Sequence, residues 1–284
     1  MSPPVVLTIA GSDSGGGAGI QADLKTFAAH RCFGASVITA VTAQNTRAVT
    51  GVHQLPAGAV AEQLAAVLDD LPVVAVKTGM LGTPEVADAI AARARAGDLP
   101  NLVVDPVLVS STGATLGVVA AIERLLPYAL VATPNVAEAA ALVGRPVTSL
   151  DEMTAAARDL AAGGPRCVVV TGGDLPPRGP SPADQSSGAA GDTQAPAESV
   201  DAMWTGAGGR LLRAPRVATG NVHGSGCTFS AAIAAQLARG AEVREAVESA
   251  KAYVTRTLAG AAGWRVGGGI GPLDHLLWDL ERPG

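Results

Sequence analysis

The chain alternates short apolar runs with alanine-rich segments, and this alternation limits its possible folds more than any other feature. The runs are apolar at nearly every position, as expected for strands that are buried on both faces of a parallel sheet. We expect strands at Val5–Ala10, Ser36–Val41, Val73–Lys77, Leu102–Asp105, Leu130–Ala132 and Cys167–Thr171. We expect helices at Ile20–Ala29, Ala57–Leu71, Glu85–Ala96, Val118–Leu125, Val136–Val143 and Leu150–Ala162. This order predicts an α/β fold with right-handed crossovers.

The remainder of the chain adds a hairpin and two longer helices. A hairpin is predicted at Val200–Arg213, with the turn sequence GAGG at its centre. The helices are predicted at about Cys227–Arg239 and Val243–Gly260. Between the last parallel strand and the hairpin, Pro176–Ser199 is rich in Pro, Gly, Ser and Ala, so we expect a mobile insertion there. Patterned sequence resumes on both sides of it, which favours one domain over residues 1–284.

Charge and cysteine content exclude several classes of partner. The net charge is −5, so we expect no general attraction to nucleic acid. No apolar stretch reaches the roughly 18 residues of a transmembrane helix, and the N-terminus lacks the basic region of a signal peptide. The three cysteines, Cys32, Cys167 and Cys227, are widely spaced and odd in number, which argues against a disulfide framework. The cysteine usage favours a protein of the reducing cytoplasm.

A first glycine-rich loop, Gly11–Gly19, follows the first predicted strand. In an open α/β sheet, ligands bind beyond the carboxyl ends of the strands, so this loop is well placed to contact one. It is not a phosphate-binding P-loop, because no Lys-Ser/Thr pair follows it. Gly17–Ala22 fits GxGxxA, but Thr39 stands where a dinucleotide fold has an acidic residue, which makes a dehydrogenase a weak alternative. A loop that closes over a small substrate is favoured over a merely flexible turn.

A second glycine-rich segment, Asn221–Cys227, leads directly into an alanine-rich helix. Gly224 and Gly226, on either side of Ser225, allow backbone N–H groups to converge, and the helix dipole adds positive potential to this anion hole. Cys227 would lie in the first helical turn, where the pKa of a thiol is typically lowered. The segment therefore suits base-assisted phosphoryl transfer. The alternative is a buried cysteine at the start of a core helix.

Polar residues at the ends of two other strands fit the same chemistry. Asp105 ends one predicted strand, so its carboxylate should lie at the carboxyl edge of the sheet. Asn135 and Glu138 follow another strand and have the spacing of a helix capping box. The same carboxylates are the hard oxygen ligands that Mg²⁺ prefers, and the two interpretations are compatible. For His223, a loop histidine without a functional role is an equally good interpretation.

Seven motifs in chain order carry a family resemblance. They are AGSDSGGGAGIQADLKTF (10–27), TAVTAQNT (39–46), KTGMLG (77–82), VVDPVLVSSTG (103–113), TPNVAEAAAL (133–142), HGSGCT (223–228) and GGIGPLDH (268–275). With them the sequence resembles the hydroxymethylpyrimidine/phosphomethylpyrimidine kinases of thiamine biosynthesis, over nearly the whole chain except Pro176–Ser199. The resemblance implies a ribokinase-like three-layer α/β/α sandwich with a mostly parallel central sheet. It also implies an ATP-dependent kinase that phosphorylates 4-amino-5-hydroxymethyl-2-methylpyrimidine and then its monophosphate.

The resemblance also implies roles for individual residues. Cys227 would be the catalytic base, and Gly224, Ser225 and Gly226 would complete the anion hole. Asp105 and Glu138 would organise Mg²⁺, mainly through water. The expected pyrimidine contacts are Gly11, Asp23, Gln44, Met80 and Val107, and the expected nucleotide contacts are Asn135, Thr171, Gly173 and His223. Members of the family suggest a homodimer.

One departure from the family pattern leaves alternatives open. Thr171-Gly-Gly173 stands where the family often has Lys-Gly-Gly, so a cation that contacts the nucleotide phosphates is missing at this position. The first alternative is a pyridoxal kinase of the same superfamily, although QADLKTF and AQNT favour the pyrimidine. The second is a homologue that binds the pyrimidine without turnover.

Overall fold

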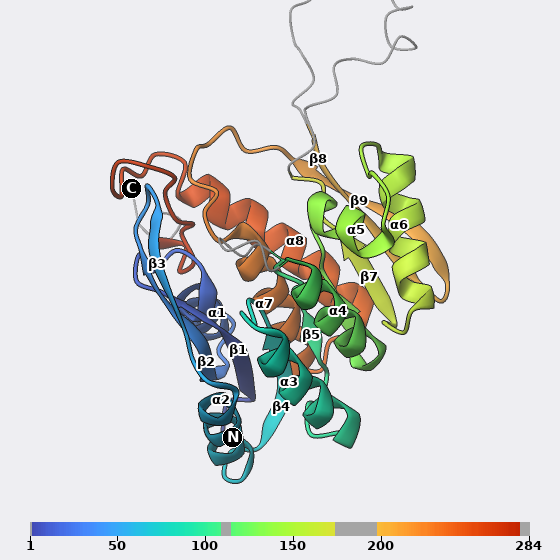
Figure 1. Ribbon diagram of the computed structural model, residues 1–284. Helices are drawn as coiled ribbons and strands as arrows, with labels where there is room; N and C mark the ends of the chain where they lie inside the picture. Colours follow the sequence, from blue (N-terminus) through green and yellow to red (C-terminus); the bar gives the residue numbers. More distant parts are fainter. Residues whose placement is uncertain (1, 109–114, 174–197, 279–284) are drawn as a thin grey trace, which may run out of the picture.

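The computed structural model describes residues 2–108, 115–173 and 198–278, and its nine strands form one sheet. The sheet order is β3-β2-β1-β4-β5-β6-β7-β8-β9. Six neighbouring strands are parallel: β2 (Phe33–Gln44), β1 (Val5–Asp13), β4 (Val73–Thr78), β5 (Val103–Val104), β6 (Val131–Ala132) and β7 (Cys167–Val170). The α/β fold predicted from the sequence is confirmed, and Figure 1 shows helices on both sides of the sheet.

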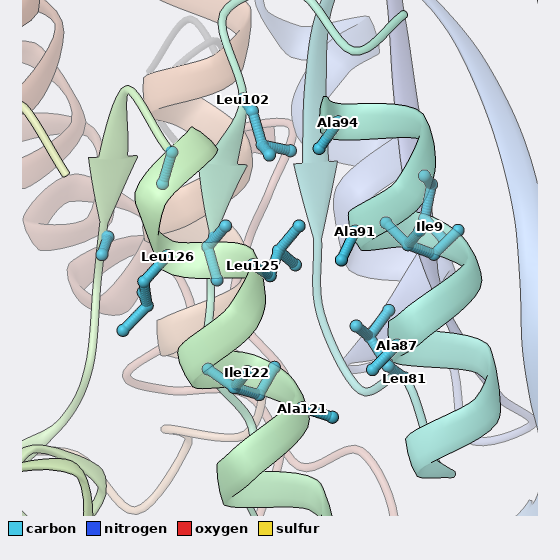
Figure 2. Packing of buried hydrophobic residues seen from close by; sticks show 14 of the residues in the cluster. Ile9, Leu81, Ala87, Ala91, Ala94, Leu102, Ala121, Ile122, Leu125 and Leu126 are labelled. Atoms are coloured by element: carbon cyan, nitrogen blue, oxygen red, sulfur yellow. The ribbon is translucent and has the colours of Figure 1, made fainter. Parts of the chain in front are cut away.

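Alternate residues of the buried strands pack into two separate cores. One face is covered by α2 (Ala57–Leu68), α3 (Pro84–Ala96), α4 (Thr115–Leu125), α5 (Val136–Val143) and α6 (Leu150–Ala162). The other is covered by α1 (Gly19–Ala29), α7 (Ser225–Ala238) and α8 (Val243–Gly260). Val104 packs into the first core and its neighbour Val103 into the second, which explains why these strands are apolar at every position. Figure 2 shows Ile122 and Leu125 of α4 in the first core.

The other three strands of the sheet pair only in antiparallel fashion. The hairpin predicted at Val200–Arg213 is confirmed as β8 (Glu198–Thr205) and β9 (Gly208–Pro215), with β8 antiparallel to β7. At the opposite edge, β3 (Val49–Gln54) pairs antiparallel with the end of β2 and was not predicted. None of its residues is buried, so its sequence has no apolar alternation. The insertion expected at Pro176–Ser199 lies, except for its last two residues, outside the described residues.

All three cysteines are free thiols, as predicted. In the described part of the chain, no helix is both long and apolar enough to cross a membrane.

Candidate active site

Several predicted site residues meet where the parallel strands end. Asp105 directly follows β5, Thr133 follows β6 and Thr171 follows β7. The parallel direction of these strands brings their carboxyl ends to one edge of the sheet, where ligands bind in open α/β folds. Two more segments approach this edge, the loop after β1 and the segment that leads into α7. The edge is therefore the candidate active site.

Cys227 lies where the N-termini of two helices converge. α7 begins at Ser225 after Gly224, which has a φ of 85°, so Cys227 is in its first turn. The N–H group of Gly19, the first residue of α1, donates a hydrogen bond to Cys227. The dipoles of both helices therefore favour negative charge at the sulfur. This arrangement fulfils the expectation of a thiol at a helix start.

The expected lowering of the Cys227 pKa is wrong for the ligand-free protein. Burial raises the pKa of Cys227 to about 12, because loss of water around the sulfur outweighs the attraction of the Lys77 ammonium. The carboxylates of Asp105 and Asp23 raise it further, and the Gly19 N–H opposes them. The sequence showed the helix start but not these two neighbouring carboxylates.

Asp23 does not occupy the position expected for a residue that contacts substrate. Its side chain has no exposed surface, and its carboxylate oxygens lie 2.9 and 3.0 Å from Lys77 Nζ. Oδ2 also accepts a hydrogen bond from Thr8 Oγ1 at 2.6 Å. A side chain without exposed surface cannot contact a ligand in this state. The structure therefore assigns Asp23 to the binding of Lys77.

Lys77 is a buried cation that the sequence analysis missed. Its Nζ also lies 3.9 Å from Asp105 Oδ2, which accepts a hydrogen bond from Ser230 Oγ at 3.0 Å. Burial disfavours the charged ammonium, but Asp23, Cys227 and Asp105 together raise the pKa of Lys77, so it stays protonated. A single lysine at the end of the apolar run VVAVKT was the signal that could have found it.

Glycines around the β1–α1 loop and at the start of α7 allow close contacts that a larger residue would prevent. A Cβ on Gly224 would lie 1.9 Å from the Gly17 oxygen, and a Cβ on Gly17 would lie 2.4 Å from His223 Cδ2. A Cβ on Gly19 would lie 2.3 Å from the Gly11 oxygen. Only glycine allows these approaches. The loop that was predicted to close over a substrate is thus packed against the segment that begins α7.

Besides Asp23, the predicted pyrimidine contacts are Gly11, Met80, Gln44 and Val107. Met80 covers Gly11 closely, since a Cβ on Gly11 would lie 2.5 Å from Met80 Cε. Gln44 ends β2, and its Nε2 lies 3.2 Å from His223 Nε2. His223 was predicted to contact nucleotide, but it lies at the β1–β2 end of the site, 2.9 Å from Asp13 Oδ2. Val107, two residues after Asp105, is partly exposed.

Three of the four residues predicted to bind nucleotide, Asn135, Thr171 and Gly173, lie after β6 and β7. Asn135 and Thr171 form an isolated bridge between the segments that follow these strands. Asn135 and Glu138 form the predicted capping box, with the Asn135 N–H donating to Glu138 Oε2 at 2.9 Å. The carbonyl oxygen of Gly173 accepts a hydrogen bond from Arg216 Nη2 at 2.8 Å. Arg216 was not predicted, because no local pattern connects it with residues so far away in the chain.

Two buried hydroxyl groups mark the same edge of the sheet. Thr78 and Thr133 lie at the ends of β4 and β6, on either side of Asp105 in the sheet order. Neither Oγ1 has a hydrogen-bond partner among the described residues. A buried hydroxyl without a partner costs free energy, which a bound ligand or water would recover. This supports a ligand site at this edge.

Solved structures with this fold identify the class of protein. A pyridoxal kinase from Staphylococcus aureus in complex with AMP-PCP and pyridoxal has a TM-score of 0.83 and 34% identity, covering 98% of this chain and 96% of that chain. A phosphomethylpyrimidine kinase from Clostridium difficile 630 has a TM-score of 0.71 and 36% identity, covering 89% of this chain and 99% of that chain. The protein is a ribokinase-like small-molecule kinase, and as such an ATP-dependent phosphotransferase.

Sequence comparison then identifies the family. The family model described as phosphomethylpyrimidine kinase matches residues 13–274. The hydroxymethylpyrimidine/phosphomethylpyrimidine kinase of Streptomyces coelicolor is 47% identical over 279 residues, which are 97% of this chain and 95% of that protein. The chain belongs to the phosphomethylpyrimidine kinase family. The resemblance inferred from the seven motifs is confirmed.

Proposed function

We propose that the protein transfers the γ-phosphate of ATP to the hydroxymethyl group of 4-amino-5-hydroxymethyl-2-methylpyrimidine. It then phosphorylates the resulting monophosphate to the diphosphate for thiamine biosynthesis. The observation that carries the proposal is the family match over residues 13–274, which includes every proposed site residue except Gly11. The Streptomyces coelicolor relative is named for both phosphorylation steps.

The proposed chemistry is in-line attack of the substrate oxygen on the γ-phosphorus, while the bond from this phosphorus to the bridging oxygen breaks and ADP leaves. The N–H groups of Gly226 and Cys227, in the first turn of α7, stabilise the negative charge on the transferred group. The Cys227 thiolate accepts the proton of the substrate hydroxyl. Because the pKa of Cys227 is about 12 in the free protein, little of this thiolate is present at neutral pH before ligands bind. Lys77 and the two helix N-termini are the groups of this chain that stabilise it.

We also propose that Asp105 and Glu138 organise Mg²⁺ through water. The donor chemistry fits, because both are carboxylates beside strand ends that carry the unpartnered Thr78 and Thr133 hydroxyls. Among the described residues, no group of three or more His, Cys, Asp or Glu could hold a metal ion directly. The ion would therefore be held jointly with phosphate oxygens and water. Bound Mg²⁺ would neutralise charge on the phosphates.

A pyridoxal kinase is the second candidate, because a pyridoxal kinase is among the solved structures with this fold. Family membership favours the pyrimidine. Comparison of kcat/KM for the pyrimidine alcohol and for pyridoxal decides between the two. A preference for pyridoxal would overturn the proposed substrate.

The direct test is incubation with ATP, Mg²⁺ and the pyrimidine alcohol, followed by mass analysis for monophosphate and diphosphate. Cys227→Ala is expected to abolish most turnover, whereas Cys227→Asp, which supplies another base, is expected to retain part of it. Cys167→Ala, in buried strand β7, is the matched control. An undiminished kcat in Cys227→Ala would remove the base role. Tight pyrimidine binding without ADP production would indicate a binding protein instead.

The remaining expectations from the sequence are part of this proposal. We propose a cytoplasmic enzyme. We also propose that residues 1–284 form one domain, because the strands of all described regions join one sheet.

We propose a homodimer, and the exposed edge strand β3, with Val49 49% exposed, is the surface that supports it. Light scattering of the wild type and Val49→Lys tests the dimer, which the variant is expected to weaken.

A further inference from the structure

We infer that Asp13 and His223 are positioning residues that fix the orientation of the Gln44 amide, and that this orientation selects an aminopyrimidine ring edge. The inference rests on the proposed function, in which Gln44 contacts the pyrimidine. It adds two residues to the pyrimidine site, one of which the sequence assigned to nucleotide binding and one to nothing.

Asp13 is a carboxylate that can only accept hydrogen bonds. Its Oδ1 accepts from the Gly15 N–H at 2.8 Å, and its Oδ2 accepts from the N–H groups of Gly17 and Ala18 at 3.0 and 2.9 Å. Burial acts to raise the pKa of Asp13, but the hydrogen bonds from His223, Ala18 and Gly15 lower it below its usual value. The carboxylate is therefore ionised at neutral pH. His223 Nε2, 2.9 Å from Oδ2, must carry the proton.

A protonated His223 Nε2 determines which end of the Gln44 amide faces it. The amide atom 3.2 Å from His223 Nε2 is drawn as Gln44 Nε2, and the proposed arrangement exchanges the nitrogen and oxygen of this amide. With the amide nitrogen at this end, two donors would face each other. With Oε1 at this end, the Nε2–H group is shared between Asp13 and Gln44, and every group has a partner.

Thr42 gives the same orientation independently. Its Oγ1 lies 3.0 Å from the Ser12 carbonyl oxygen and 3.0 Å from the amide atom drawn as Gln44 Oε1, so one hydroxyl proton would face two acceptors. The hydroxyl has one proton, and the carbonyl can only accept, so that proton goes to Ser12. The hydroxyl oxygen must then accept from Gln44, which places the amide nitrogen toward Thr42.

The fixed amide offers a defined pattern to a ligand. One N–H remains at the Thr42 end and one oxygen lone pair at the His223 end. The Gln44 backbone is also held, since its N–H donates to Ser14 Oγ at 2.9 Å and its carbonyl accepts from the same hydroxyl at 2.7 Å. An aminopyrimidine presents a ring-nitrogen acceptor beside an amino donor, which matches this pattern. Pyridoxal has no amino group there and would leave the Gln44 oxygen unpaired.

Nitrogen NMR tests the proposed hydrogen bonds of His223 without substrate. In protein labelled at its four histidines, the ligand-free His223 is expected to be the Nε2–H tautomer at pH 8. Its signal is assigned by its absence from His223→Gln. A proton on Nδ1 with Nε2 bare would overturn the inference. The tautomer is read in wild-type protein without substrate, so the result stands whether or not the pyrimidine is the substrate.

Kinetics test the positioning role. His223→Leu is expected to raise the KM for the pyrimidine alcohol about five- to tenfold, the usual effect of one lost hydrogen bond, and to change kcat and the KM for ATP less than twofold. The preference for the pyrimidine over pyridoxal should fall with it. His53→Leu, an exposed histidine on β3, is the matched control. His223→Gln, which keeps an N–H donor, is expected to recover part of the loss.

A double-mutant cycle separates the inference from its alternatives. In a Gln44→Ala background, His223→Leu should cause no further rise in the pyrimidine KM. Additive effects, or an effect mainly on the KM for ATP, would overturn the positioning role. If wild-type protein turns over no pyrimidine at all, the proposed function fails, and the histidine tautomer still decides the hydrogen-bond arrangement.

Discussion

Lys77 Nζ lies 2.9 Å from Asp23 Oδ2, and neither side chain has any exposed surface. A buried ion pair loses much of the stabilisation that water gives its charges, so it adds little net stability on its own. Removal of one partner is costly, however, because it leaves the other charged without compensation. Here the ammonium also faces Asp105 and Cys227, so the pair holds a cation beside the proposed base.

Lys77→Met is therefore expected to lower the free energy of unfolding by about 3–5 kcal/mol, because it leaves Asp23 buried without its cation. Arg93→Met, which breaks an exposed pair with Asp98 at 3.0 Å, is the control, with an expected loss of about 0–1 kcal/mol. Urea unfolding measures both. The double variant Lys77→Met/Asp23→Asn should be more stable than Lys77→Met alone. Equal losses in the lysine and arginine variants would contradict this interpretation.

The reactivity of Cys227 in the ligand-free protein should be low at pH 7 and rise with pH. A thiol reacts as its thiolate, and a pKa of about 12 leaves little thiolate at neutral pH. The rate of alkylation by iodoacetamide should increase about tenfold per pH unit between pH 7 and 9. Mass spectrometry locates the label, and Cys227→Ser gives the background from Cys32 and Cys167. A rate that is already constant above pH 7 would show a low pKa.

Gly224→Ala tests the contact between the two glycine-rich loops. The substitution places a Cβ 1.9 Å from the Gly17 oxygen and also strains a φ of 85°. Gly240 has a φ of 89° with no atom within 4 Å of its Cβ, so Gly240→Ala isolates the backbone strain, about 1–2 kcal/mol. Gly224→Ala should cost more than this in thermal or urea unfolding and should lower kcat. Equal losses would mean that the loops separate easily.

Arg216→Ala is expected to raise the KM for ATP about fivefold, with the pyrimidine KM unchanged. Arg216 donates to the carbonyl of Gly173 just beyond β7, and it supplies a cation near the position where Thr171 replaces the family's usual lysine. The fivefold figure corresponds to the loss of about one hydrogen bond. Arg213→Ala, which breaks the exposed pair between β9 and Glu198, is the matched control. Unchanged ATP kinetics in Arg216→Ala would exclude the role.

Much of the site was predictable because its residues follow strong local patterns. Asp105 after a buried strand, the capping box of Asn135 and Glu138, and Cys227 at a helix start each depend on neighbours a few positions away. The resemblance also predicts ligand contacts at Gly11, Gln44 and Met80, which stay predictions, and it assigned Asp23 a contact that its burial prevents. β3 could not be predicted, because an exposed edge strand has no apolar period.

The sequence by itself determined the fold class, the family and the positions of the glycine-rich loops, because local patterning and motif order are properties of the chain alone. Only the tertiary structure decided how charge is distributed in the site. Lys77 meets Asp23 across 54 positions, and His223 meets Asp13 across 210. The pKa of Cys227 depends on groups that the chain brings together only when it folds. Electrostatic effects depend on distance and burial, and neither is a property of sequence spacing.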